Sequence, residues 1–143
     1  MKLIGATLGL LLILVGCGGS STEEEAGNKK YFIKVGDKIS ETAKSKGVNY
    51  TGDGISNEAI FSIGATKLYL YDFYNVSKLS PVKLESQSFG AIIEFDESIE
   101  GTATINKVTS TGTNQIGENF DLVGDFAGNN GESGSFCVSM FHM

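Results

Sequence analysis

The sequence predicts an all-β domain, either an antiparallel β-sandwich or a small barrel, of about seven to eight strands. Short segments rich in β-branched and aromatic residues, many alternating with polar ones, recur along the chain at spacings of roughly ten residues. Clusters of glycine, asparagine and aspartate separate them, and these residues favour tight turns. No internal repeat of about 20 to 50 residues is evident, which argues against a solenoid.

The chain begins with one positive charge, Lys2, and an apolar run from Leu3 to Val15. A helix over this run would be about 20 Å long, shorter than the roughly 30 Å hydrocarbon core of a bilayer. Such a charged start and short apolar middle are typical of a secretory signal. The alternative, a buried helix of the mature domain, is disfavoured because the run is apolar all round and a polar stretch follows it.

The residues Leu14-Val15-Gly16-Cys17 directly follow this run and resemble the lipobox of bacterial lipoproteins. The resemblance implies that residues 1–16 are a cleaved lipoprotein signal peptide and that the Cys17 sulfur receives a diacylglycerol. Acyl chains such as palmitate on Cys17 would then anchor the protein to a membrane, since two or more chains bind stably. The alternative is an ordinary secreted protein with a coincidental cysteine. Residues 17–28, rich in Gly, Ser and Glu, are expected to form a flexible tether.

Residues 29–143 remain for one β domain, a length typical of a single compact unit. Its first strand contains the alternating Tyr31, Ile33 and Val35, and Gly36-Asp37 suits a two-residue turn. The segment from Ile39 to Lys46 is compatible with a short helix or a strand. The further expected strands are EAIFSI, KLYLYDFY, SFGAIIEF, GTATINKV, ENFDLVGDF and GSFCVSMF. The expected turns are Gly64 to Thr66, Asp96 to Gly101, Gly112 to Asn114 and Gly128 to Gly131.

Alternation within these strands assigns side chains to two faces. Asp121 and Asp125 are expected on an acidic outer surface, opposite the apolar residues of their strand. Cys137 is interpreted as a small buried thiol, with a reactive thiol or an intermolecular bridge as alternatives. The expected inward residues are Phe89, Ala91, Ile93, Phe95, Phe120, Leu122, Phe126, Phe136, Val138 and Met140.

The charge of the chain is unevenly distributed. Net charge is +4 over residues 29–84 and −8 over residues 85–132, and all eleven basic residues are lysines. The absence of arginine and of a basic surface argues against a nucleic-acid partner. The acidic half is expected to act mainly on solubility.

No recognisable catalytic or cofactor-binding motif is present, so the protein is not expected to be an enzyme or to hold a cofactor or metal. The single histidine, His142, is five residues from Cys137, and an odd separation in one strand places two residues on opposite faces. Four carboxylates, Glu94, Asp96, Glu97 and Glu100, surround an expected turn. They lack the ordered spacing of a calcium-binding loop, and a solvated hairpin tip is the favoured interpretation.

Tyr69, Tyr71 and Phe73 share one face of their strand, while Leu68 and Leu70 take the other. These aromatic residues either fill the core or form an outward ligand-binding face. Core packing is the favoured interpretation, because aromatic residues commonly fill sandwich interiors.

The C-terminal third, with GTATI, FDLVGDF and GSFCV joined by Gly/Asn turns, is similar to small uncharacterised bacterial lipoproteins with β-sandwich domains. That resemblance implies a fold class and no activity. We therefore expect a non-catalytic envelope lipoprotein that binds a protein or a small ligand. The alternatives are an assembly component that uses a sheet edge, and an envelope hydrolase or its inhibitor.

The final location follows from the residue after Cys17. In the Gram-negative lipoproteins that this chain resembles, an aspartate there tends to retain the protein at the inner membrane, whereas here the residue is Gly18. In a Gram-negative cell the resemblance implies outer-membrane anchoring, with exposure on the cell surface as a further expectation. In a Gram-positive cell the same anchor would lie on the outer leaflet of the only membrane. The acidic run Glu23 to Glu25 would keep the tether extended, and it resembles some surface-export signals.

Overall fold

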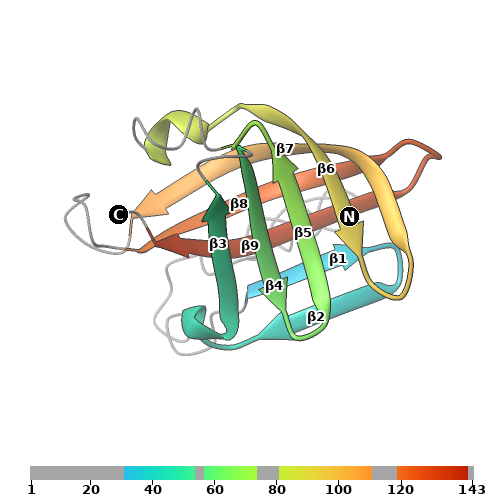
Figure 1. The fold of residues 1–143 in the computed structure, drawn as a ribbon, viewed down its shortest axis with the longest axis horizontal. Coiled ribbons are helices and arrows are strands. Elements are labelled where there is room, and N and C mark those ends of the chain that lie inside the picture. Colours follow the sequence, from blue (N-terminus) through green and yellow to red (C-terminus); the bar gives the residue numbers. More distant parts are fainter. Residues whose placement is uncertain (1–30, 54–56, 74–80, 111–118, 142–143) are drawn as a thin grey trace, which may run out of the picture.

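A computed structural model describes residues 31–53, 57–73, 81–110 and 119–141 of the chain. Within these residues it contains nine antiparallel strands and two short 3₁₀ helices (Figure 1). The strands are β1 Tyr31–Val35, β2 Lys38–Thr42, β3 Val48–Asp53, β4 Glu58–Ile63, β5 Thr66–Tyr71, β6 Ser88–Glu94, β7 Ser98–Ser110, β8 Asn119–Gly128 and β9 Ser133–Phe141. The 3₁₀ helices are η1 Ser45–Gly47 and η2 Pro81–Leu84.

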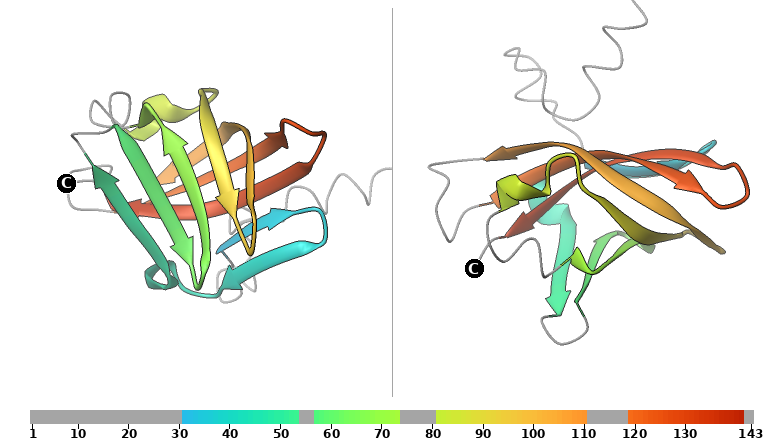
Figure 2. Two further views of the ribbon diagram at one scale, coloured as in Figure 1. Left: turned by 45° about the vertical axis from the view of Figure 1, so that its right-hand side comes forward. Right: turned by 90° about the horizontal axis from the view of Figure 1, so that it is seen from above.

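The nine described strands form one sheet in the order β2-β1-β9-β8-β7-β6-β5-β4-β3. From β3 to β9 each strand pairs with the next in sequence, and β1 then pairs with β9. The sheet coils back toward itself, and its two edge strands, β2 and β3, follow one another along the chain through η1 (Figure 2). The all-β prediction is therefore confirmed. Of the two expected architectures, a sandwich or a small barrel, the structure shows a nearly closed barrel.

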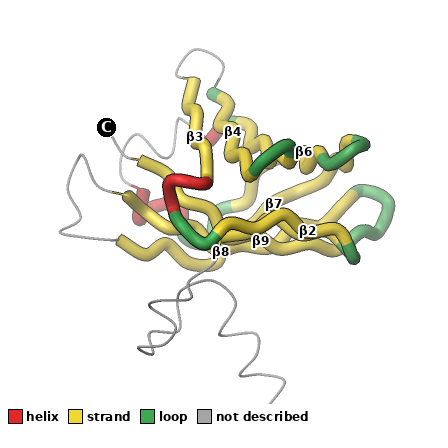
Figure 3. The backbone as a smooth tube through the Cα atoms, turned by 90° about the horizontal axis from the view of Figure 1, so that it is seen from below, coloured by secondary structure: helices red, strands yellow, loops and turns green. Residues whose placement is uncertain are grey.

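The barrel is flattened, with β3, β4 and β6 on one side and β2, β8 and β9 on the other (Figure 3). The ladder of hydrogen bonds is interrupted only between the two edges, β2 and β3, of the described sheet. We call this interruption the seam. A hydrogen bond between the Ser40 and Thr66 hydroxyl groups, whose oxygens are 2.5 Å apart, joins β2 to β5 across the seam.

Two tight hairpins agree with the turn residues of the sequence. Val35 pairs with Lys38 around Gly36-Asp37, and Ile63 pairs with Thr66 around Gly64-Ala65. Gly36 and Gly64 have φ of 59° and 61°, a region that glycine enters without steric cost.

Three boundaries differ from the prediction. The ambiguous segment after Ile39 is a strand only as far as Thr42, and η1 then leads into β3, a strand that the sequence did not predict. Strand β3 was missed because VNYTGD carries few apolar residues and three turn-forming ones, Asn49, Gly52 and Asp53. Strand β7 begins at Ser98 because the expected turn is only a three-residue loop between the paired Glu94 and Ser98. The expected turn from Gly112 to Asn114 lies outside the described residues.

The interior of the barrel is filled by side chains. Phe61, Phe73, Phe120 and Phe136 are among the largest fully buried residues. Ring centroids of Tyr50, Phe61, Phe73 and Phe89 follow one another at 5.0, 5.8 and 5.3 Å, within the range of favourable aromatic contacts.

The predicted inward face of the other strands is largely confirmed. All ten predicted inward residues are buried except Phe95, which is partly buried against the core. Because side chains fill the interior, a ligand would contact the outer surface of the sheet rather than its lumen.

Candidate ligand-binding face

Strand β5 divides its side chains between the core and the outside of the barrel. Leu68 and Leu70 are fully buried, whereas Tyr69 is half-buried and Tyr71 is 37% exposed. The favoured interpretation, core packing of both tyrosines, is therefore wrong. Successive side chains of a strand point to opposite faces, and in β5 it is Leu68 and Leu70 that point into the barrel.

Phe73 does not share the face of the two tyrosines. Strand β5 ends at Tyr71, and Asp72 has a positive φ of 62°, which turns the chain and ends the alternation. Phe73 is consequently fully buried, and its ring lies against Phe61 and Phe89. The predicted ligand face of Tyr69, Tyr71 and Phe73 is thus corrected to the two tyrosines.

Two isoleucines on neighbouring strands complete an apolar surface around Tyr69. In the registers of β4, β5 and β6, Ile60 and Ile92 lie directly opposite Tyr69 on either side, and both are half-buried. We call the surface of Ile60, Tyr69, Tyr71 and Ile92 the outer tyrosine face. The sequence signal for the isoleucines was present, since each alternates with buried neighbours in EAIFSI and SFGAIIEF.

Gly90 provides an open place beside Tyr71. A Cβ atom built at Gly90 would be 3.9 Å from Cδ2 of Tyr71, an ordinary contact, and no other heavy atom lies closer to it. The tyrosine ring therefore borders a short stretch of bare β6 backbone. Such a surface lets a ligand approach the ring from the side.

Three glutamates border the outer tyrosine face. Glu58 pairs with Tyr71, Glu100 pairs with Ile92, and Glu94 lies near Tyr69, whose hydroxyl donates to Glu94 Oε1 at 3.4 Å. We call Glu58, Glu94 and Glu100 the acidic rim.

The acidic rim affects the ionisation of both tyrosines. The pKa of Tyr69 is raised above 10.0 by burial first and then by the charge and hydrogen bond of Glu94, with Glu58 and Tyr71 adding to the effect. The pKa of Tyr71 is raised by burial and by the charges of Glu58 and Glu100. Both phenols therefore stay neutral throughout the physiological pH range.

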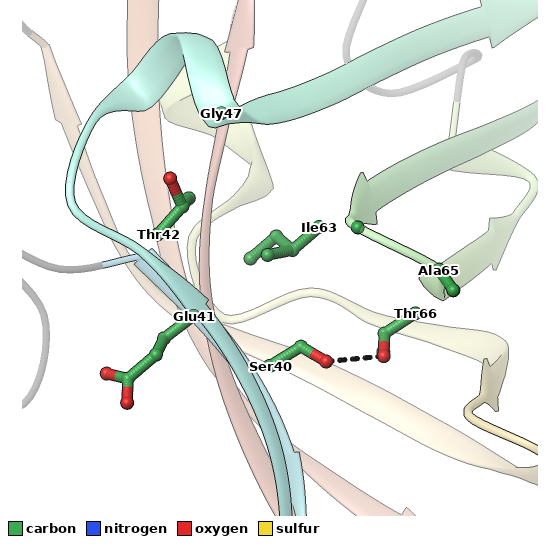
Figure 4. A pocket seen from close by; sticks show the side chains of 8 residues that line it. Ser40, Glu41, Thr42, Gly47, Ile63, Ala65 and Thr66 are labelled. Carbon is green, nitrogen blue, oxygen red and sulfur yellow. Dashed lines mark hydrogen bonds between the residues drawn. The ribbon is translucent and has the colours of Figure 1, made fainter.

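An open groove of about 440 Å³ lies at the seam (Figure 4). Its lining includes Ser40, Thr42, Ile63 and Thr66, and the Glu41 carboxylate points away from the other drawn side chains. The Ser40 and Thr66 hydroxyls are hydrogen-bonded to each other.

The four carboxylates of the expected hairpin tip are spread over strand ends and loop. Glu94 ends β6, Asp96 and Glu97 lie in the loop, and Glu100 lies within β7. Among residues 31–53, 57–73, 81–110 and 119–141, no three or more His, Cys, Asp or Glu side chains are grouped to hold a metal ion. Glu94 instead accepts hydrogen bonds from Tyr69 and Ser98.

Asp121 departs from the expected acidic outer surface. It is only 4% exposed, and the Tyr31 hydroxyl donates to both of its carboxylate oxygens, at 3.1 and 3.2 Å. The shared donor helps to offset the cost of burying this carboxyl group. Asp125 is exposed as expected and accepts a hydrogen bond from Asn106.

Cys137 is fully buried in β9, between Phe32 of β1 and Val123 of β8, as its apolar sequence neighbours predict. The structure gives its sulfur as disulfide-bonded rather than as a thiol. The other cysteine of the chain, Cys17, lies outside the described residues. A thioether on Cys17 and a disulfide between Cys17 and Cys137 exclude each other, because one sulfur cannot form both.

The remaining sequence-predicted features also lie outside the described residues: the signal peptide, the tether and His142. No helix in the described part of the chain is long and apolar enough to cross a membrane. No family model matches the chain, and neither a curated protein nor a solved structure is detectably similar to it.

Proposed function

We propose that the protein is a lipid-anchored, non-catalytic envelope lipoprotein whose β domain binds a protein or a small ligand. The lipobox Leu14 to Cys17 supports the anchor. The observation that carries the binding role is the outer tyrosine face, where Tyr71 is exposed and Tyr69, Ile60 and Ile92 are half-buried. Clusters of aromatic and aliphatic side chains on an otherwise polar surface are typical of interaction sites.

The assembly alternative has less support. The edge strands of the sheet, β2 and β3, have five and six residues, and β2 carries the charged Lys38 and Glu41. Short, charged edges are the features that limit strand addition. Ile39, 49% exposed on β2, is the one observation in the described edges that favours this alternative.

The anchor is tested with the substitution Cys17→Ser. Cells producing the natural protein or the variant are labelled with a fatty-acid probe and fractionated. Loss of acyl label and of membrane association in the variant is expected, because serine cannot form the thioether. The mass of the natural peptide containing Cys17 distinguishes a diacylglycerol thioether from a disulfide, and a disulfide would contradict the proposal.

The binding role is tested by photo-crosslinking in cells. A photoreactive phenylalanine derivative at position 71 lies on the outer tyrosine face, and the same residue at position 37, in the exposed β1–β2 turn, serves as the control. A discrete adduct from position 71 and none from position 37 is expected. Equal labelling from both positions, or none from position 71, would refute a binding role for this face.

A further inference from the structure

The outer tyrosine face has a strongly unbalanced charge. The three carboxylates of the acidic rim lie on the outer side of β4, β6 and β7. Among the described outward residues of β4, β5 and β6, and of β7 as far as Thr104, Lys67 is the one cation, and it lies opposite Glu94 in the β5–β6 register. Lys83 is also exposed, but it lies in η2, outside these strands. The next cation along β7, Lys107, lies past the bulge and opposite Val123 of β8. The face around the tyrosines is therefore net acidic.

The dimensions of the face suit a short segment of polypeptide. Ile60, Tyr69, Ile92 and Glu100 form one row across four consecutive strands of the sheet. Neighbouring strands lie about 4.8 Å apart, so this row spans about 14 Å. An extended chain covers that length with about four to five residues.

Both chemical components of the face favour the same kind of side chain. The faces of tyrosine rings attract the cations of lysine and arginine, and carboxylates pair with them. Tyr69 and Tyr71 are neutral phenols at physiological pH, so a cation is attracted to the faces of their rings while the carboxylates supply the negative charge. Phosphate groups of lipids or nucleic acids would instead be repelled by the acidic rim.

We propose that the outer tyrosine face binds a basic segment of a partner protein, with Lys or Arg side chains over Tyr69 and Tyr71 and against Glu58, Glu94 and Glu100. The apolar stems of these side chains contact Ile60 and Ile92, while their charged ends reach the acidic rim. This inference rests on the proposed binding function, and it adds the chemical class of the partner.

The test uses the full-length protein in a neutral detergent and three fluorescent peptides. One peptide alternates arginine and leucine, the second replaces each arginine with glutamate, and the third replaces each arginine with glutamine. Fluorescence anisotropy is expected to show saturable binding of the arginine peptide alone. Absence of this binding, or equal binding of the glutamine or glutamate peptide, would overturn the proposal.

Two sets of variants distinguish peptide binding at the outer tyrosine face from a general effect of the protein's net charge. The triple variant Glu58→Gln, Glu94→Gln and Glu100→Gln, and the double variant Tyr69→Ser and Tyr71→Ser, are each expected to weaken binding by about tenfold or more. The matched control, Asp37→Asn, Asp96→Asn and Glu97→Gln, removes the same charge from exposed turns and is expected to keep the natural affinity. Equal loss in both triple variants would show a non-specific charge effect and overturn the proposal.

The crosslinking experiment at position 71 distinguishes this inference from the proposed function. An adduct whose crosslinked peptide, identified by mass spectrometry, contains Lys or Arg at the contact supports both. An adduct to an acidic or uncharged segment would leave the binding function standing and refute the basic partner. The absence of any adduct would refute the binding function itself.

Discussion

At the residue scale, the functional interpretation depends on which side of β5 each side chain takes. Leu70 is fully buried and its neighbour Tyr71 is exposed, so one residue step separates a core position from a candidate binding position. Both sets of side chains in LYLY are large and apolar or aromatic, so these four residues do not show the direction of the alternation. The sequence signal for the outward side is Lys67, a charged residue that alternates with Tyr69 and Tyr71.

Neighbouring substitutions in β5 test this assignment. Leu70→Ala is expected to lower the free energy of unfolding by about 2–5 kcal/mol, because it leaves a cavity in a filled core. Tyr71→Ala is expected to lower it by less than about 1 kcal/mol, since the side chain is largely on the surface. Chemical denaturation of the two variants measures the difference. The opposite ranking would place the tyrosines inside.

The tyrosine ionisation provides a second test at this scale. Because the folded pKa of Tyr69 lies above 10.0, the contribution of neutral Tyr69 to stability is complete below pH 10.0 and is lost as pH rises through the folded value. Glu94→Gln is expected to lower the pKa of Tyr69, since it removes both a negative charge and a charged hydrogen-bond acceptor.

The measurement is a pH titration of the tyrosine ring carbons by NMR. Glu97→Gln is the control, because Glu97 lies in the adjacent loop and is not a cause of the Tyr69 shift. An unchanged Tyr69 pKa in Glu94→Gln would show that the Tyr69–Glu94 contact does not form in solution.

At the element scale, glycines within strands show where the sheet is tightly packed and where it is open. A Cβ atom at Gly124 in β8 would meet the Thr104 carbonyl oxygen and the Phe136 ring, whereas a Cβ atom at Gly90 in β6 would meet only the Tyr71 ring at 3.9 Å. Gly124 and Gly90 are therefore expected to differ in their tolerance of a larger side chain, although both are glycines within strands.

Gly124→Ala is expected to lower the free energy of unfolding by about 1–3 kcal/mol, because the backbone or the Phe136 ring must move. Gly90→Ala is expected to leave stability within about 0.5 kcal/mol of the natural protein. Thermal or chemical denaturation compares the pair. Similar stability of both variants would contradict the close approach of β7, β8 and Phe136.

At the scale of the whole molecule, the proposal combines a folded barrel with a membrane anchor at Cys17. Gly18, where an aspartate would favour retention at the inner membrane, supports outer-membrane anchoring in a Gram-negative cell. The expected result is recovery of the protein in the outer-membrane fraction of a density gradient. A Gly18→Asp variant is the matched control and is expected to move toward the inner membrane.

Surface exposure is tested separately by adding protease to intact cells. Cleavage of the β domain is expected if the acidic tether accompanies export to the surface, and complete protection would contradict that part of the proposal. Recovery of the natural protein in the inner-membrane fraction would contradict the outer-membrane location.

The sequence by itself determined the strand-rich class, most strand positions, the inward residues of β6, β8 and β9, and the lipobox hypothesis. These features are local, because alternation, turn residues and a cleavage motif are each read within a few positions. Only the tertiary structure decided that one sheet nearly closes into a barrel, that β3 is a strand, and that Asp121 is buried against Tyr31. It also decided that Tyr69 and Tyr71 face outward with Ile60, Ile92 and the acidic rim, since the order and direction of strand pairing bring these residues together from distant parts of the chain.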